Sequence, residues 1–95
     1  MFEAWLDRLA DATAVARIIA RLDRLQAGNF GDHKPVGESV WELRIDHGPG
    51  YRVYYAIAGR RVVLLLYGGD KRKQSSDIRR AIGILKDYKR TEPKS

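Results

Sequence analysis

The stretch that decides the fold runs from Val40 to Tyr67 and reads VWELRIDHGPGYRVYYAIAGRRVVLLLY. Apolar and polar residues alternate in its first part, which is typical of a strand with one buried face. Turn-forming residues at 47–50 and 59–60 divide the stretch into three segments. We therefore predict a three-stranded antiparallel meander, and we place residues 61–67 in a central strand because they are apolar on both faces.

The turn lengths predict which residues face each other. In the first hairpin the register places all large apolar side chains on one face, and the helices should pack against that face. The cross-strand pairs on it are Trp41 with Tyr55, Leu43 with Val53, and Ile45 with Tyr51. The same register sets Arg44 opposite Arg52 on the other face. A two-residue loop at Gly59 and Arg60 then sets Arg52 opposite Tyr67, so we expect Arg44, Arg52 and Tyr67 to line up across three strands.

Helical periodicity flanks this stretch on both sides. Residues 1–27 predict a helical hairpin in which Asp11 caps the second helix and Gly28 stops it. The apolar stripe of that second helix is expected on Val15, Ile19, Leu22 and Leu25. Residues 75–89 predict a C-terminal helix capped by Ser75, Ser76 or Asp77.

The chain is thus predicted to be one α+β domain over residues 1–95. A helical hairpin (1–27) packs on a small antiparallel sheet (32–69) of at least three strands, followed by the C-terminal helix (75–89) and a charged tail (90–95). The turn-rich residues before Val40 carry at most a short edge strand.

The amino-acid composition excludes several kinds of functional site. The chain has no cysteine, which excludes disulfides, thiol nucleophiles and cysteine-ligated metals. His33 and His47 are its two histidines, and we expect both in exposed turns, without a metal or cofactor. No apolar run approaches the ~20 residues of a membrane span, and the N-terminus is acidic and amphipathic, so we expect a cytoplasmic protein without membrane contact.

The net charge of +6 lies entirely in residues 31–95, which points to a polyanion or an acidic protein as partner. Arg44 and Arg52 opposite each other repel, so either Glu42 and Asp46 neutralise them or the pair awaits an anion. Both interpretations stay open.

The apolar strand runs into GGDKRK at 68–73, which is either a solvated loop or one side of a phosphate site. In the second case Lys71, Arg72 and Lys73 add positive charge beside the arginines. The neighbouring cations disfavour the protonated form of Lys71 or Lys73. A lysine that acts as a general base must be deprotonated, so this effect would favour such a role. Tyr54 and Tyr67 would then stack RNA bases.

Residues 28–88, GNFGDHKPVGESVWELRIDHGPGYRVYYAIAGRRVVLLLYGGDKRKQSSDIRRAIGILKDY, following a helical hairpin, resemble the RelE/ParE superfamily of type II toxins. The combination of ELRI, GYRVYY and LLLYGGDKRKQ is similar to the HigB-like branch, the addiction module killer proteins. The resemblance implies a RelE-like fold, metal-independent cleavage of mRNA on the ribosome, and a cognate helix-turn-helix antitoxin as partner.

Carried over by position, the resemblance implies that Arg44, Arg52, Lys71 and Lys73 are catalytic and that Tyr54, Tyr67 and Arg72 bind RNA. Two features depart from the family pattern. Relatives usually begin with a strand, whereas Met1 opens the first helix here, so we expect a start site placed too late or a missing edge strand. The catalytic histidine of some HigB relatives has no match. Two alternatives remain, a ParE-like inhibitor of DNA gyrase and a degenerate member that only binds an antitoxin.

Overall fold

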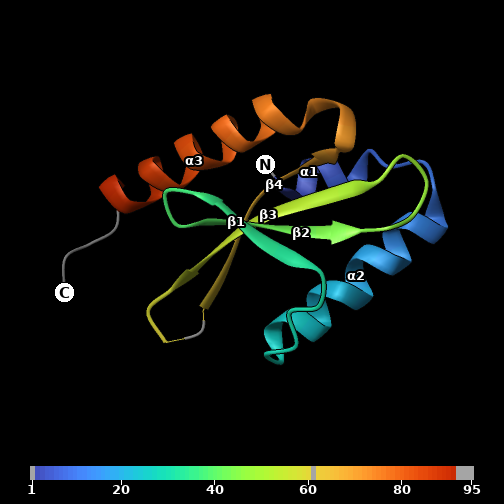
Figure 1. Cartoon of the computed structure of the whole chain (residues 1–95), viewed down its shortest axis with the longest axis horizontal. Coiled ribbons are helices and arrows are strands. Elements are labelled where there is room, and N and C mark those ends of the chain that lie inside the picture. Colours follow the sequence, from blue (N-terminus) through green and yellow to red (C-terminus); the bar gives the residue numbers. More distant parts are fainter. Residues whose placement is uncertain (1, 61, 92–95) are drawn as a thin grey trace.

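The computed structural model describes residues 2–60 and 62–91 and has the expected α+β architecture (Figure 1). Its elements in chain order are the helices α1 (Phe2–Asp7) and α2 (Ala12–Gln26), the strands β1 (His33–Gly37), β2 (Val40–Ile45), β3 (Tyr51–Ala58) and β4 (Val62–Asp70), the 3-10 turn η1 (Lys71–Lys73), and the helix α3 (Gln74–Thr91). The four strands form one antiparallel sheet in the order β1-β2-β3-β4. Across the described ranges, no helix combines the length and apolar character that crossing a bilayer requires.

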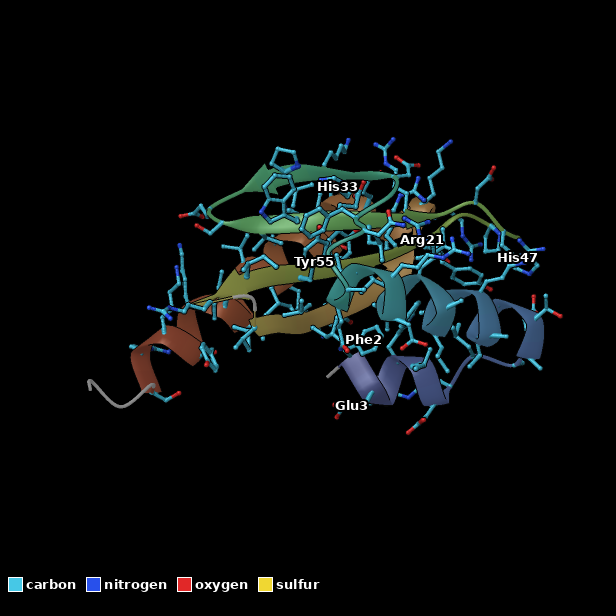
Figure 2. The ribbon with its side chains drawn as sticks, turned by 90° about the horizontal axis from the view of Figure 1, so that it is seen from below. Phe2, Glu3, Arg21, His33, His47 and Tyr55 are labelled. Atoms are coloured by element: carbon cyan, nitrogen blue, oxygen red, sulfur yellow. The ribbon has the colours of Figure 1, made fainter. Side chains whose placement is uncertain are left out.

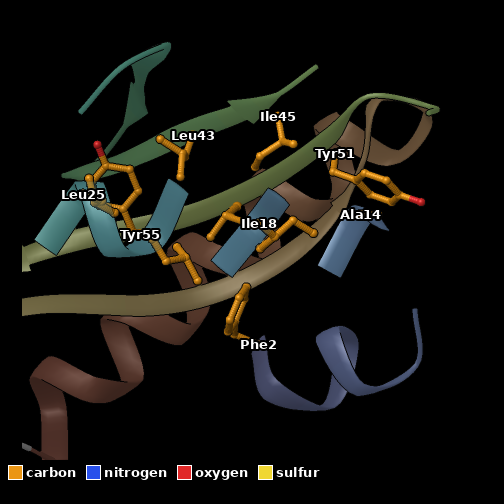
Figure 3. Close-up of a cluster of buried hydrophobic side chains, with 10 residues drawn as sticks. Phe2, Ala14, Ile18, Leu25, Leu43, Ile45, Tyr51 and Tyr55 are labelled. Carbon is orange, nitrogen blue, oxygen red and sulfur yellow. The ribbon is translucent and has the colours of Figure 1, made fainter. Parts of the chain in front are cut away.

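The two N-terminal helices cover one face of the sheet (Figure 2). The first hairpin has the predicted register, with Trp41 opposite Tyr55 and Arg44 opposite Arg52. The predicted apolar face is therefore confirmed. It packs against α1 and α2 in one cluster, much of it seen in Figure 3, of Phe2, Ala14, Ile18, Leu22, Leu25, Leu43, Ile45, Tyr51, Val53 and Tyr55.

Helix α2 begins and ends where the sequence predicts. The carboxylate of Asp11 accepts hydrogen bonds from the backbone N–H groups of Thr13 and Ala14, and Gly28 follows the helix at φ +90°. Leu22 and Leu25 of the predicted stripe are buried, whereas Ala14 and Ile18 are buried in place of Val15 and Ile19, and Ile19 is 46% exposed. Ile18 and Ile19 both lie on possible helical stripes, and only the packing of α2 on the sheet decides between them.

Helix α3 covers the opposite face, so our expectation that the helices share one face is wrong. Its Ala81 and Leu85 pack with Val40, Tyr54, Ala56 and Leu66 of the sheet. In the sheet formed by the described residues, β4 is an edge strand and not a central one. It is apolar on both faces because α1 contacts one face and α3 the other.

The register between β3 and β4 also differs from the prediction. Ala58 pairs with Val62, so the loop is longer than two residues, and its residue 61 lies outside the described part of the chain. The register then shifts between Tyr54 and Tyr55, as at a β-bulge, which sets Tyr54 opposite Tyr67. Arg52 consequently faces Gly69, and the predicted pairing of Arg52 with Tyr67 is wrong.

The start of α3 corrects the predicted cap. Asp70 caps η1 by accepting a hydrogen bond from the N–H of Arg72, and α3 follows directly from Gln74. Asp77 is buried inside the helix and caps nothing. At the other end, residues 90 and 91 of the predicted tail belong to α3. The expectations for residue 1 and for residues 92–95 lie outside the described residues.

Candidate functional site

A pocket of about 350 Å³ lies at the end of the sheet where β2 turns into β3. Three cationic side chains line it, those of Arg44, Arg52 and Lys71. The carboxylates of Asp32 and Asp46 and the turn 48–50 complete its wall. The structure therefore brings together three of the seven residues that the sequence nominated, and all three come from the set expected to be catalytic.

Arg44 and Arg52 face each other across β2 and β3, and Glu42 lies beside both. The Nε of Arg44 donates to Oε1 of Glu42 over 2.9 Å, while the Nε of Arg52 lies 3.7 Å from the same oxygen. Glu42 is fully buried, with an exposed fraction of 0%. Its negative charge reduces the repulsion between the arginines, which is the first of the two interpretations left open by the sequence.

Glu42 serves both guanidinium groups, and Asp32 and Asp46 line the same pocket, so its three cations lie among three carboxylates. The hydrogen bond from Arg44 to Glu42 raises the pKa of Arg44, which keeps this side chain charged. The Arg44 side chain is 35% exposed and the Arg52 side chain 11%. Arg52 Nε is buried and has no hydrogen-bond partner within the described ranges. The Nη groups of Arg44 make no hydrogen bond within the described ranges, and they are the donors that this pair offers to an anion.

Lys71 joins this pocket through the backbone. Its N–H donates to the carbonyl of Gly50 over 2.9 Å, which ties η1 to the β2–β3 turn. Gly50 has φ +83°, a conformation that favours glycine, and a Cβ there would lie 3.4 Å from Nη1 of Arg52. The turn thus holds Lys71 close to the arginines.

The other cations of the basic turn do not line this pocket as the structure describes it. Arg72 pairs with Asp70 over 3.2 Å, and this hydrogen bond lowers the pKa of Asp70. Lys73 is exposed at the end of η1. We expected Lys71 and Lys73 to act on the same pocket, and the structure brings only Lys71 there.

The two tyrosines nominated for stacking are not available in the way that we expected. Tyr54 has an exposed fraction of 0% between the sheet and α3, and burial raises the pKa of its hydroxyl. Stacking by Tyr54 on a base is therefore excluded in this conformation. Tyr67 is half-buried, and the guanidinium of Arg80 lies 5.4 Å from the centre of its ring.

Gly68 and Gly69 serve the packing of the helices. A Cβ at Gly68 would overlap the indole ring of Trp5 in α1, and a Cβ at Gly69 would overlap the carboxylate of Asp77 in α3. Both glycines are buried in β4. Their absent side chains therefore let α1 and α3 approach the two faces of the strand, which is neither the solvated loop nor the phosphate site that the sequence left open for them.

Two residues that sequence analysis missed organise the surroundings of the pocket. Gln74, the first residue of α3, donates from Nε2 to Oε2 of Glu42 over 2.6 Å. Arg21 of α2 donates from Nη1 to the carbonyl of Arg44 over 2.6 Å and from Nη2 to that of Asp32 over 3.4 Å (Figure 2). Arg21 is one of several arginines in α2, and no local pattern in the sequence distinguishes it from the others.

The histidines lie elsewhere. Nε2 of His47 is 3.1 Å from Oδ2 of Asp11, which links the β2–β3 turn to the N-terminus of α2. His33 packs between Phe30 and Trp41, with ring centres 5.1 and 5.3 Å away. The part of the chain that the structure describes contains no group of three or more potential metal ligands.

Comparison with known proteins identifies relatives of the chain. A family model described as "Phage derived protein Gp49-like (DUF891)" matches residues 4–89. An uncharacterized protein of Haemophilus influenzae is 51% identical over 80 residues, which make up 84% of this chain and 81% of that protein. No solved structure matches the chain significantly. The family match includes every residue that lines the pocket.

Proposed function

We propose that this chain, which belongs to the phage-derived Gp49-like family of toxin-like addiction-module proteins related to RelE and ParE, is a HigB-like toxin that cleaves mRNA on the ribosome. A cognate antitoxin, a helix-turn-helix protein, neutralises it. The reaction is an endonucleolytic phosphoryl transfer that needs no metal ion.

The arrangement of Arg44 and Arg52 carries this proposal. Two guanidinium groups directly opposite each other share a single buried carboxylate, and Lys71 lies at the same pocket. Glu42 reduces the repulsion between the arginines from their Nε side, and a bound phosphate would do so from their Nη side. A phosphodiester fits the forked donor geometry of arginine, and in the described structure Arg44 keeps its Nη groups free for it.

In this reaction the 2′-hydroxyl attacks the adjacent phosphorus and the bond to the 5′ oxygen breaks. The proton of the 2′-hydroxyl is removed, and the 5′ oxygen receives a proton as it leaves, so the products are a 2′,3′-cyclic phosphate and a 5′-hydroxyl. Arg44 and Arg52 stabilise the charge that develops on the phosphoryl oxygens. We assign proton transfer to Lys71, since its backbone is tied to Gly50 beside Arg52.

Expression in bacteria tests the proposal. Induction of the full chain should arrest growth and produce breaks in translated transcripts, mapped by primer extension, while untranslated RNA stays intact. Arg52→Ala should slow cleavage at least about 100-fold, as the loss of one charge-stabilising donor does. Arg17→Ala, which removes an exposed arginine of α2, is the matched control and should cleave at the rate of the unaltered protein.

Other outcomes identify other functions. Growth arrest with intact transcripts and relaxed plasmids would show that the chain inhibits DNA gyrase and does not cleave mRNA. Growth without arrest, combined with tight binding of the antitoxin, would make the chain a binding protein only. Full cleavage by Arg52→Ala would disprove the assignment of the pocket.

A further inference from the structure

Glu42 has a fully buried carboxylate. It lies where β2, β3 and α3 meet. It belongs to β2 and contacts Arg44 two residues further along the same face, Arg52 on β3 and Gln74 at the start of α3. Taking an ionised carboxylate out of water is costly unless it is paired and hydrogen-bonded. Glu42 therefore occupies a position that ordinary packing would give to an apolar residue.

The two oxygens of Glu42 have separate partners. Oε1 accepts from Arg44 Nε over 2.9 Å and is 3.7 Å from Arg52 Nε. Oε2 accepts from Gln74 Nε2 over 2.6 Å. One side of the carboxylate thus acts on the arginines, and the other holds the first residue of α3, which directly follows η1 and Lys71.

Different contacts fix the two guanidinium groups, a hydrogen bond from Nε in Arg44 and, in Arg52, a hydrogen bond from Nη1 together with a longer ion pair from Nε. Arg44 uses Nε for Glu42, which leaves both of its Nη groups for other acceptors. Arg52 directs Nε towards the same oxygen and donates from Nη1 to the carbonyl of Tyr51 over 3.1 Å. Because the guanidinium is planar and rigid, fixing its Nε side also fixes the direction of its Nη side.

We propose that Glu42 is a positioning residue of the anion pocket. Its carboxylate orients the guanidinium groups of Arg44 and Arg52 for a bound phosphate and, through Gln74, holds Lys71 in register with them. The inference rests on the proposed function for its consequence on RNA cleavage, but its effect on the arginines can be measured without RNA.

Removing the charge of Glu42 should have opposite effects on anion binding and on the rate of cleavage. This difference distinguishes a positioning role from simple structural support. Glu42→Gln preserves the shape of the side chain and removes one negative charge beside two arginines. Attraction of an anion should therefore persist or increase, whereas the orientation of the arginines should relax. A displacement of about 1 Å at reacting groups can slow a reaction by about 100-fold. We expect slower chemistry without weaker binding.

The first measurement follows the Nε–H signals of arginine by NMR in the full-length, 15N-labelled protein, with inorganic phosphate as the probe. In the unaltered protein the signal of Arg44 should exchange slowly with water, and phosphate should shift the signals of both Arg44 and Arg52. Glu42→Gln should accelerate the exchange of Arg44 at least about tenfold. Glu38→Gln, which removes an exposed carboxylate paired with Lys86, makes the same change of charge and should leave these signals unaltered.

The second measurement is single-turnover cleavage of mRNA on purified ribosomes. Glu42→Gln should lower the maximal rate by about 10- to 100-fold and should leave the half-saturating concentration within about threefold or decrease it. Glu38→Gln should match the unaltered protein. A variant that merely unfolds in part would lose active molecules, so the integrity of both variants is verified by their NMR spectra.

A second substitution covers the case in which Glu42→Gln fails to fold. Gln74→Ala retains the charge of Glu42 but removes the hydrogen bond to Oε2. It should also accelerate exchange at Arg44 and slow cleavage. If Gln74→Ala, or a folded Glu42→Gln, leaves both properties as in the unaltered protein, the positioning role is overturned. If the unaltered protein cleaves no RNA but Glu42→Gln still releases Arg44, the proposed function fails and the positioning role stands.

Discussion

A methyl group at Gly68 tests how α1 is held on the sheet. A Cβ at this position would overlap the indole ring of Trp5. The ring cannot simply tilt away, because it packs against Phe2 with ring centres 5.7 Å apart and against Tyr51 with centres 6.2 Å apart. Gly68→Ala must therefore move α1 away from β4 or bend the strand.

The structure bounds the cost of this change. Forcing an extra carbon into a packed contact typically costs about 1–3 kcal/mol. Trp5 is half-buried, so losing its contacts costs less than the ~3–5 kcal/mol of a fully buried tryptophan. Helix α1 has six residues, which is too short for it to form without its contacts. We expect Gly68→Ala to lower the free energy of unfolding by about 2–3 kcal/mol, which shifts the urea midpoint by roughly 2 M.

Urea unfolding followed by tryptophan fluorescence and by circular dichroism measures this effect. The matched control is Gly83→Ala in α3, where a Cβ would meet no described atom within 4 Å. Replacing glycine by alanine inside a helix stabilises by about 1 kcal/mol, so the two substitutions should have opposite signs. A loss below about 0.5 kcal/mol for Gly68→Ala would refute the packing of Trp5 on this glycine.

Two further predictions concern polar groups buried between α3 and the sheet. Tyr54→Phe should leave the free energy of unfolding unchanged or raise it by about 1 kcal/mol, since a buried hydroxyl without a hydrogen-bond partner in the described structure is unfavourable. A loss of about 2 kcal/mol in urea unfolding would show that the hydroxyl is hydrogen-bonded, with the nearby Glu42 as its partner. Burial raises the pKa of Asp77, so its carboxyl group binds a proton more tightly in the folded protein than in the unfolded chain. The free energy of unfolding should therefore fall as pH rises from ~4 through the raised pKa. Asp77→Asn should abolish that fall, and unfolding measured between about pH 3 and 7 would contradict the reasoning if both proteins keep the same pH profile.

The hairpin between β2 and β3 shows how far local patterns reach. Its alternation of apolar and polar residues, together with the turn at 47–50, predicts both the pairing and the buried face, and both are confirmed. A slip of one residue would expose every apolar side chain of the strand, so the pattern tolerates a single register. The opposition of Arg44 and Arg52 follows from the same register.

The hairpin between β3 and β4 shows where local patterns stop. Residues 62–67 are apolar on both faces, so a slip in register exposes nothing polar, and neither the longer loop nor the shift beside Tyr54 leaves a signal in the sequence. The same ambiguity led us to predict β4 in the centre of the sheet, whereas it lies at the edge. Its two apolar faces result from α1 and α3, which are far apart in the sequence.

The sequence by itself determined the helical hairpin, the register of β2 on β3, and the two arginines that face each other. Those properties depend on side-chain periodicity and turn chemistry within a few residues. Only the tertiary structure decided that α3 covers the face opposite to α1 and α2, that Tyr54 is buried under it, and that Glu42 and Gln74 meet beneath the arginines. Burial and hydrogen bonding between β2 and α3 depend on how the elements pack across the sheet, and no local pattern carries that information.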